Sequence, residues 1–167
     1  MISSDDEISS GEELPRRFFT LDEANQRLPL VRVIVADIVT LFTDVQDRRQ
    51  RLADLLQRDA NRGQRTQSVY TEELEQMQAD IDTDIERLNA FARELAELGA
   101  ELKDPTIGLI DFPARVDDRE VCLCWQQGES DIAFWHETDT GFAGRRPVDD
   151  LPAKVKHKQK EANILAP

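Results

Sequence analysis

The chain has 167 residues, and its 34 Asp and Glu against 21 Lys and Arg give a formal net charge of −13. This excess of negative charge repels nucleic acid and anionic membranes, so we expect neither as a partner. Two cysteines are too few for a disulfide-stapled secreted scaffold, and the first residues lack a signal-peptide pattern, so we expect a cytoplasmic protein. The longest apolar stretch, residues 28–42, is interrupted by Arg32 and Asp37 and is not expected to span a membrane.

The N-terminal region predicts a disordered tail followed by a helix. Residues 1–17 are rich in Ser, Asp and Glu, which is typical of a disordered acidic tail. Thr20 and Glu23 have the spacing of a capping box. We expect the helix that begins there to end near Arg27, because a proline disfavours helical geometry in the residue before it. Pro29 then either begins a second, longer helix or lies in a kinked continuation.

Residues 29–103 carry the seven-residue apolar repeat of a coiled coil in two separate stretches. A polar segment with one glycine, residues 58–65, lies between them and predicts a connector. Two amphipathic helices joined by a short connector form an antiparallel hairpin. The repeats are Val31, Ile38, Val45 and Leu52 in the first stretch, and Leu74, Ile81, Leu88, Leu95 and Leu102 in the second.

Each repeat has one charged residue in its seam, Arg48 in the first and Asp84 in the second. If the hairpin folds about Thr66, these two residues lie at the same level. An ion pair at this point would set the register of the two helices. The alternative is that both side chains lie at the seam edge and extend into water.

The region 107–137 alternates apolar and polar residues, which predicts three short strands in an antiparallel sheet: Leu109–Phe112, Glu120–Trp125 and Ile132–Glu137. Turns centred near residues 117–118 and 129 set the register. One face is then expected to pack on the hairpin, and it holds Ile110, Phe112, Leu123, Trp125, Ala133 and Trp135. The other face holds Leu109, Asp111, Cys122, Cys124, Phe134 and His136.

The remainder is expected to be a loop, residues 138–148, and a basic C-terminal tail, residues 149–167. In the loop we expect Phe142 to be buried and Arg145 to point back to acids of the sheet or hairpin, with Asp111 the first candidate. The predicted fold is therefore α+β, with a long antiparallel, coiled-coil-like helical hairpin and a small three-stranded antiparallel sheet in one domain, residues 18–148.

Four residues are candidates for a small-ligand site: Asp111, Cys124, His136 and Arg145. The glycine-containing loop and Arg145 have the chemistry to hold a carboxylate or phosphate. Cys122, Cys124 and His136 are the candidate metal ligands, because thiolate and imidazole suit zinc or another borderline metal. We favour the simpler interpretation, in which the cysteines pack as small apolar residues and the arginine pairs with acids.

Several segments resemble a bacterial family catalogued as domain of unknown function 2203, over residues 18 to about 148. The resemblance implies no activity. In that family an aromatic residue usually occupies the position of Cys122, which implies that Cys124, His136 and Asp111 are the residues of interest. The segments are FTLDEAN at 19–25, LPLV at 28–31, GLIDFP at 108–113, EV at 120–121, LCW at 123–125, IAFWH at 132–136 and GFAGR at 141–145.

The predicted elements carry more apolar surface than one hairpin and three strands can bury. We therefore expect a non-enzymatic, self-associating interaction module, with a homodimer as the first choice, no cofactor and no identified protein partner. The alternative is a small-ligand or metal-binding domain, with or without enzymatic activity, whose site lies on the sheet face of Asp111, Cys124 and His136.

Overall fold

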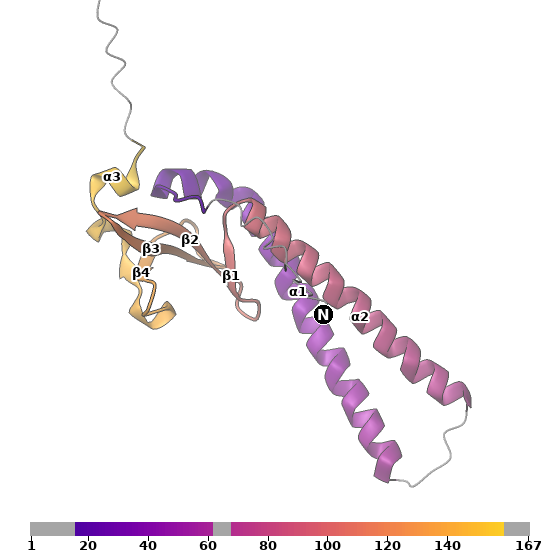
Figure 1. Cartoon of the computed structure of the whole chain (residues 1–167). Helices are drawn as coiled ribbons and strands as arrows, with labels where there is room; N and C mark the ends of the chain where they lie inside the picture. The colour runs from indigo at the N-terminus through magenta and orange to yellow at the C-terminus, as the bar shows by residue number, and fades with distance from the viewer. Residues whose placement is uncertain (1–15, 62–67, 159–167) are drawn as a thin grey trace, which may run out of the picture.

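The computed structural model describes residues 16–61 and 68–158 and has an α+β architecture (Figure 1). Most of the predicted N-terminal tail, residues 62–65 of the predicted connector and the last nine residues lie outside the described residues. The first half of the predicted connector, residues 58–61, is helical and belongs to α1, so the helix ends later than expected. Two long helices are followed by a five-stranded antiparallel sheet in the order β1-β2-β3-β4-β5. The elements are α1 Leu21–Asn61, α2 Ser68–Glu97, β1 Glu101–Asp104, β2 Leu109–Val116, β3 Arg119–Gln126, β4 Phe134–Glu137, η1 Phe142–Gly144, β5 Arg146–Pro147, η2 Val148–Asp150 and α3 Ala153–Lys156.

Helix α1 begins at the predicted capping box and continues through Pro29. The Thr20 hydroxyl accepts a hydrogen bond from the Glu23 amide, and the Glu23 carboxylate accepts one from the Thr20 amide, both at 3.2 Å. The predicted helix end near Arg27 is wrong, because residues on both sides of the proline are buried in the same core. The alternative of a kinked continuation fits Figure 1, where the first turns of α1 lie at an angle to the rest.

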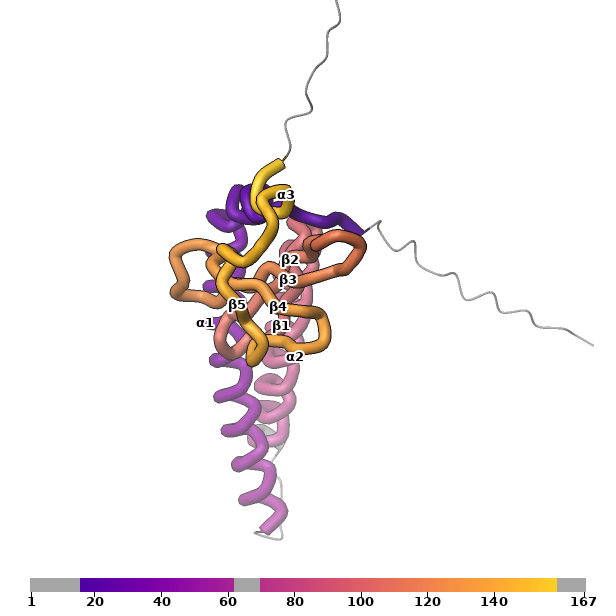
Figure 2. The backbone as a smooth tube through the Cα atoms, turned by 90° about the vertical axis from the view of Figure 1, so that its left-hand side faces the viewer, coloured from indigo at the N-terminus to yellow at the C-terminus, as the bar shows by residue number. Residues whose placement is uncertain are grey.

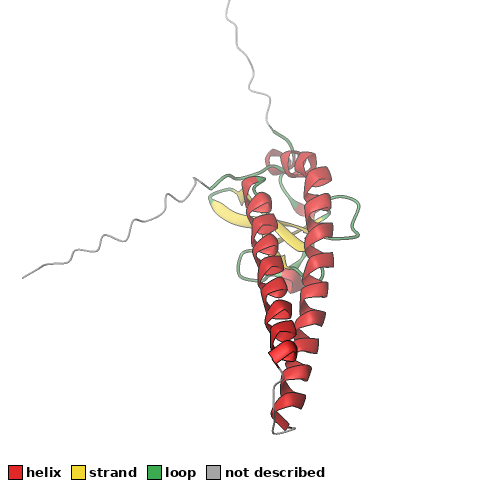
Figure 3. Ribbon diagram, turned by 90° about the vertical axis from the view of Figure 1, so that its right-hand side faces the viewer, coloured by secondary structure: helices red, strands yellow, loops and turns green. Residues whose placement is uncertain are grey.

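Helices α1 and α2 lie side by side and run in opposite directions (Figures 1 and 3). The predicted pairing at mid-seam is confirmed, because Arg48 forms an ion pair with Asp84. The predicted hairpin end at residue 103 is wrong. Gly99, at φ +89°, ends α2: its amide donates to Ala96 and the amide of residue 100 donates to the carbonyl of Leu95.

The sheet has five strands and not the three that the sequence predicts. The central register is as predicted, with Ile110 opposite Trp125 and Leu123 opposite Trp135. The two additional strands are β1 and β5. The sequence does not predict β1, because Leu102 continues the apolar repeat of the helix before it, and it does not predict β5, because that strand is only two residues long. The predicted strand Ile132–Glu137 begins only at Phe134, so Ala133 lies outside it. Ala133 was expected on the buried face but is exposed, and Ile132 is buried instead.

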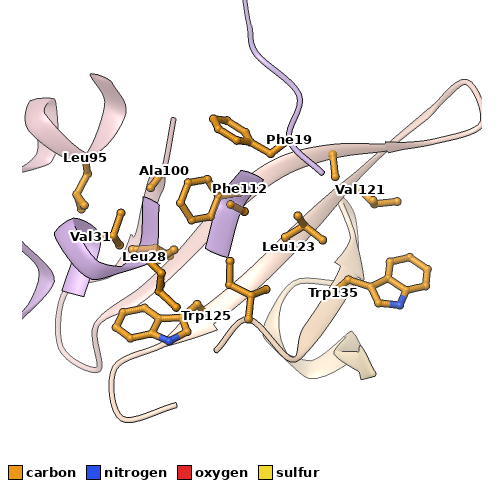
Figure 4. Close-up of a cluster of buried hydrophobic side chains, with 14 of the residues drawn as sticks. Phe19, Leu28, Val31, Leu95, Ala100, Phe112, Val121, Leu123, Trp125 and Trp135 are labelled. Carbon is orange, nitrogen blue, oxygen red and sulfur yellow. The ribbon is translucent and has the colours of Figure 1, made fainter. Parts of the chain in front are cut away.

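The two long helices, α1 and α2, lie on one face of the sheet (Figures 2 and 3). Side chains of this face, Phe112 and Trp125 among them, meet Leu28 of α1 and Leu95 of α2 in the main core (Figure 4). The predicted burial of both tryptophans is confirmed. Residues 149–158 were expected to be part of a basic tail, but Leu151 and Val155 are buried in this core.

A second, smaller core lies between the two helices farther from the sheet. Its buried residues are Val45, Leu52, Leu74 and Ile81. Leu88, a seam position of the second predicted repeat, is half-buried and packs against both cores. Among the described helices, none is long and apolar enough to cross a membrane.

Candidate functional site

The second face of the sheet, which points away from α1 and α2, carries the predicted site residues. Asp111 comes from β2, Cys122 and Cys124 from β3, and His136 from β4. Asp111 lies opposite Cys124 and His136 lies opposite Cys122 in the register of the three strands. All four side chains are buried. The alternation of strand residues therefore brings together the polar residues that the sequence places on this face.

His136 and Asp111 form a buried pair at the centre of this face. The Nε2 atom of His136 lies 3.1 and 3.0 Å from the two carboxylate oxygens of Asp111. The Nδ1 atom lies 2.7 Å from the carbonyl oxygen of Glu137. A carbonyl oxygen only accepts hydrogen bonds, so Nδ1 carries a proton and donates it there.

The contact between Nε2 of His136 and the Asp111 carboxylate needs a positive charge between the two groups. With Nδ1 protonated, a neutral imidazole has a lone pair at Nε2, which would face the negative oxygens of Asp111. A buried contact of that kind is repulsive unless a positive charge lies between the two groups. A proton meets this requirement, either on Nε2 or shared with the carboxylate. A metal ion bound by both residues also meets it.

Cys122 joins this pair. Donor atoms of Asp111, Cys122 and His136 all lie within 4.8 Å of one another. The sequence predicts Cys124 as the cysteine of the site, together with Asp111 and His136. The structure brings Cys124 beside Asp111 and Arg145, but Cys122 is the thiol that reaches both the carboxylate and the imidazole.

Both thiols are held in the neutral form. Burial raises the pKa of Cys122 to about 12, and the charge of Asp111 acts in the same direction. Burial also raises the pKa of Cys124 to about 12, again with a contribution from Asp111. A neutral thiol is a weak nucleophile, so neither cysteine is set up for nucleophilic catalysis.

The raised thiol pKa values predict a loss of stability in alkaline solution. The unfolded chain releases the thiol protons near pH 9 while the folded protein keeps them until about pH 12, so the free energy of unfolding falls across this range. The slope from each thiol is up to about 1.4 kcal/mol per pH unit. This slope is measured by urea unfolding at several pH values under reducing conditions. The wild type is compared with a double variant, Cys122→Ala with Cys124→Ala. Equal slopes in the two proteins would contradict the prediction.

Arg145 points back to an acid of the sheet region, as predicted, but this acid is Glu129 in the turn between β3 and β4 and not the first candidate, Asp111. Its guanidinium forms an ion pair with Glu129 at 2.6 Å and donates to the carbonyl of Cys124 at 3.4 Å. It also stacks over the rings of Phe134 and Phe142. The expected burial of Phe142 is wrong, since 46% of this residue is exposed. An anion at Arg145 would have to displace the Glu129 carboxylate, so the geometry does not favour an anion site there.

Lys103 also lies near the site, and the sequence does not predict this position for it. It lies close enough to Asp111 and Cys122 for their charges to interact, and its side chain pairs with Glu101 at 3.0 Å. The Glu101 carboxylate raises the pKa of Lys103 above its usual value. The lysine falls inside the predicted hairpin, and only Gly99 signals that the helix ends before it.

Comparisons with curated proteins and with solved structures find no significant match to this chain. A family model does match, over residues 17–148, which include both long helices, all five strands and every residue of the candidate site. The chain therefore belongs to the family described as uncharacterized conserved protein, DUF2203.

Proposed function

We propose that the protein is a non-enzymatic interaction protein whose helical hairpin binds a second copy of the chain. The relevant region is the distal arm, which we define as residues 44–61 of α1 and 70–84 of α2. Its buried side chains pack only against the facing helix, without any contribution from the sheet. Figures 1 and 3 show the hairpin extending well beyond the sheet.

An apolar groove along one side of the hairpin is the observation that carries this proposal. Near the tip, Leu52, Leu56 and Leu74 line a hollow of about 390 Å³. Closer to the sheet, Phe42 and Ile85 line a second hollow of about 240 Å³. The lining residues on α1 recur every three or four positions, so both hollows lie on one face of that helix. Together they form a groove into which another helix pair can pack.

The opposite side of the hairpin has a different character. Arg48 pairs there with Asp44 at 2.9 Å and also with Asp84, which pairs in turn with Arg87 at 3.0 Å. The side chains of Asp44 and Arg87 are each 59% exposed, so these charges lie at the solvent surface. The groove side instead exposes Leu56, which is 50% accessible. The opposite side also has a hollow, of about 470 Å³, but Asp37, Asp44 and Arg87 are among its lining residues. The groove is therefore the more apolar side, which supports association through it.

The charges of the distal arm favour a second copy as the occupant. Residues 70–84 of α2 contain six acidic and no basic residues, whereas residues 44–61 of α1 contain four arginines and four aspartates. Arg49, which lines the groove, and Arg58 make no ion pair within the described part of the chain. In a two-fold dimer, Arg49 and Arg58 of α1 in each copy can face the acidic α2 of its partner, and these contacts bring opposite charges together.

Leu56→Glu tests the proposal. The side chain is half exposed in the monomer, so the variant should fold, but a charge in a closed groove should weaken the dimer by at least about 100-fold in Kd. Sedimentation equilibrium over a range from low to high micromolar measures the association. The matched control is Gln57→Glu, which adds the same charge to an exposed neighbouring position outside the groove.

A wild-type protein that stays monomeric at high micromolar concentration would refute self-association. Equal weakening by Leu56→Glu and Gln57→Glu would show that the contact is not in the groove. Dimerisation of the wild type, with loss only in Leu56→Glu, is the result that the proposal requires.

A further inference from the structure

We propose that Asp111, Cys122 and His136 form a binding site for one zinc ion or a similar borderline divalent cation. The three side chains offer one oxygen, one sulfur and one nitrogen donor, and all of these atoms lie within 4.8 Å of one another. This mixed donor set suits zinc better than magnesium or calcium, which prefer oxygen ligands alone. The proposal concerns the sheet and does not depend on association through the distal arm.

The spacing of the donors is close to that of a bound site. Ligand atoms around a tetrahedral zinc ion, at bond lengths of 2.0–2.3 Å, are separated from one another by about 3.3–3.8 Å. His136 and Asp111 are already 3.0 Å apart. A side-chain movement of about 1 Å or less closes the remaining distance to the sulfur, since no donor pair is farther apart than 4.8 Å.

The orientation of His136 gives independent support. Its Nδ1 proton is donated to the Glu137 carbonyl at 2.7 Å, which directs Nε2 to the other two donors. Histidines that bind metals usually make such a hydrogen bond with the nitrogen that does not bind, because it sets the tautomer and the ring orientation. The contact between Nε2 and the Asp111 oxygens also requires a positive charge between them, and a cation bound by both supplies it.

The charges of the site can balance a dication. Asp111 and a Cys122 thiolate together carry two negative charges, and the thiol gives up its proton when the ion binds. Lys103, whose charge interacts with Asp111 and Cys122, has a side chain that is 45% exposed and pairs with Glu101, so it can remain toward solvent. Three protein ligands leave a fourth position, which water or a ligand atom can occupy.

Cys124 provides a matched control within the same strand. Cys124 lies on the same face of the sheet as Cys122, and both side chains are buried. Burial also raises the pKa of both thiols to about 12. However, Cys124 is not part of the donor cluster. Replacement of each cysteine by serine therefore separates metal binding from a general effect of removing a buried thiol.

The experiment titrates the metal-free, full-length protein with Co²⁺ under reducing conditions and records the absorption of thiolate-to-cobalt charge transfer. We expect one equivalent to bind in the wild type and in Cys124→Ser, and no charge-transfer band in Cys122→Ser. His136→Gln should weaken binding by at least about tenfold. Added Zn²⁺ should raise the Tm of the wild type and of Cys124→Ser but not of Cys122→Ser.

Circular dichroism checks that each variant is folded, and Cys122→Ala replaces Cys122→Ser if the serine variant is not. The absence of a charge-transfer band in the wild type would overturn the proposal and leave the His136–Asp111 pair as a site for a proton alone. Loss of the band in Cys124→Ser but not in Cys122→Ser would also overturn it, because the sulfur ligand would then be the wrong one.

Discussion

Phe112→Ala is expected to lower the free energy of unfolding by about 3–5 kcal/mol, since it removes a fully buried aromatic ring from a closed core. The side chain has no exposed surface and packs edge-on against Phe19, with ring centroids 5.2 Å apart. It therefore holds the start of α1 on the sheet. Chemical denaturation monitored by circular dichroism measures the loss.

Phe142→Ala is the matched control, because it removes the same ring from a residue that is 46% exposed. Its ring contacts the guanidinium of Arg145 at 4.9 Å, and a contact of this kind contributes about 0.5–1 kcal/mol. A loss of 3 kcal/mol or more in this variant, as in Phe112→Ala, would mean that Phe142 is covered in solution.

Leu28→Ala is expected to cost about 2–5 kcal/mol. Leu28 is 1% exposed and lies in the core between α1 and the sheet, one residue before Pro29. A proline within a helix costs about 3 kcal/mol, so α1 continues through this point only because its buried side chains offset that cost. Loss of Leu28 should therefore also reduce the helix content at the start of α1, which amide hydrogen exchange can measure.

Leu30→Ala, two residues along the same helix, removes the same atoms from a side chain that is 54% exposed. We expect a change below about 0.5 kcal/mol, as for a surface position. If Leu30→Ala cost as much as Leu28→Ala, the face of α1 that meets the sheet would be misassigned.

Local patterns in the chain predict much of this architecture. The apolar repeats specify two amphipathic helices, and the seam charges specify their register, which the ion pair of Arg48 and Asp84 confirms. The alternation in 107–137 specifies which residues share each face of the sheet, except for Ala133, which lies outside the strand. Asp111 and His136 can be placed together for this reason, since a turn of known length sets the register of neighbouring strands.

Other features depend on contacts between distant parts of the chain. The edge strands β1 and β5 form only because a central strand lies beside each of them, and their own residues favour no strand. The chain remains helical at Pro29 because residues before and after it, Leu28 and Val31, are buried in the main core. Leu151 and Val155 follow a run with no strong pattern, yet they are buried because the sheet and α1 leave an apolar surface that they cover.

In the candidate site, too, some features follow from local sequence patterns and others only from contacts between distant segments. Periodicity along the strands places Asp111, both cysteines and His136 on one face, because successive strand residues alternate between faces. The twist of the sheet decides which cysteine reaches Asp111 and His136. The path of the loop after β4 decides that Arg145 pairs with Glu129. Those are three-dimensional relations between separate segments, and no spacing within one segment encodes them.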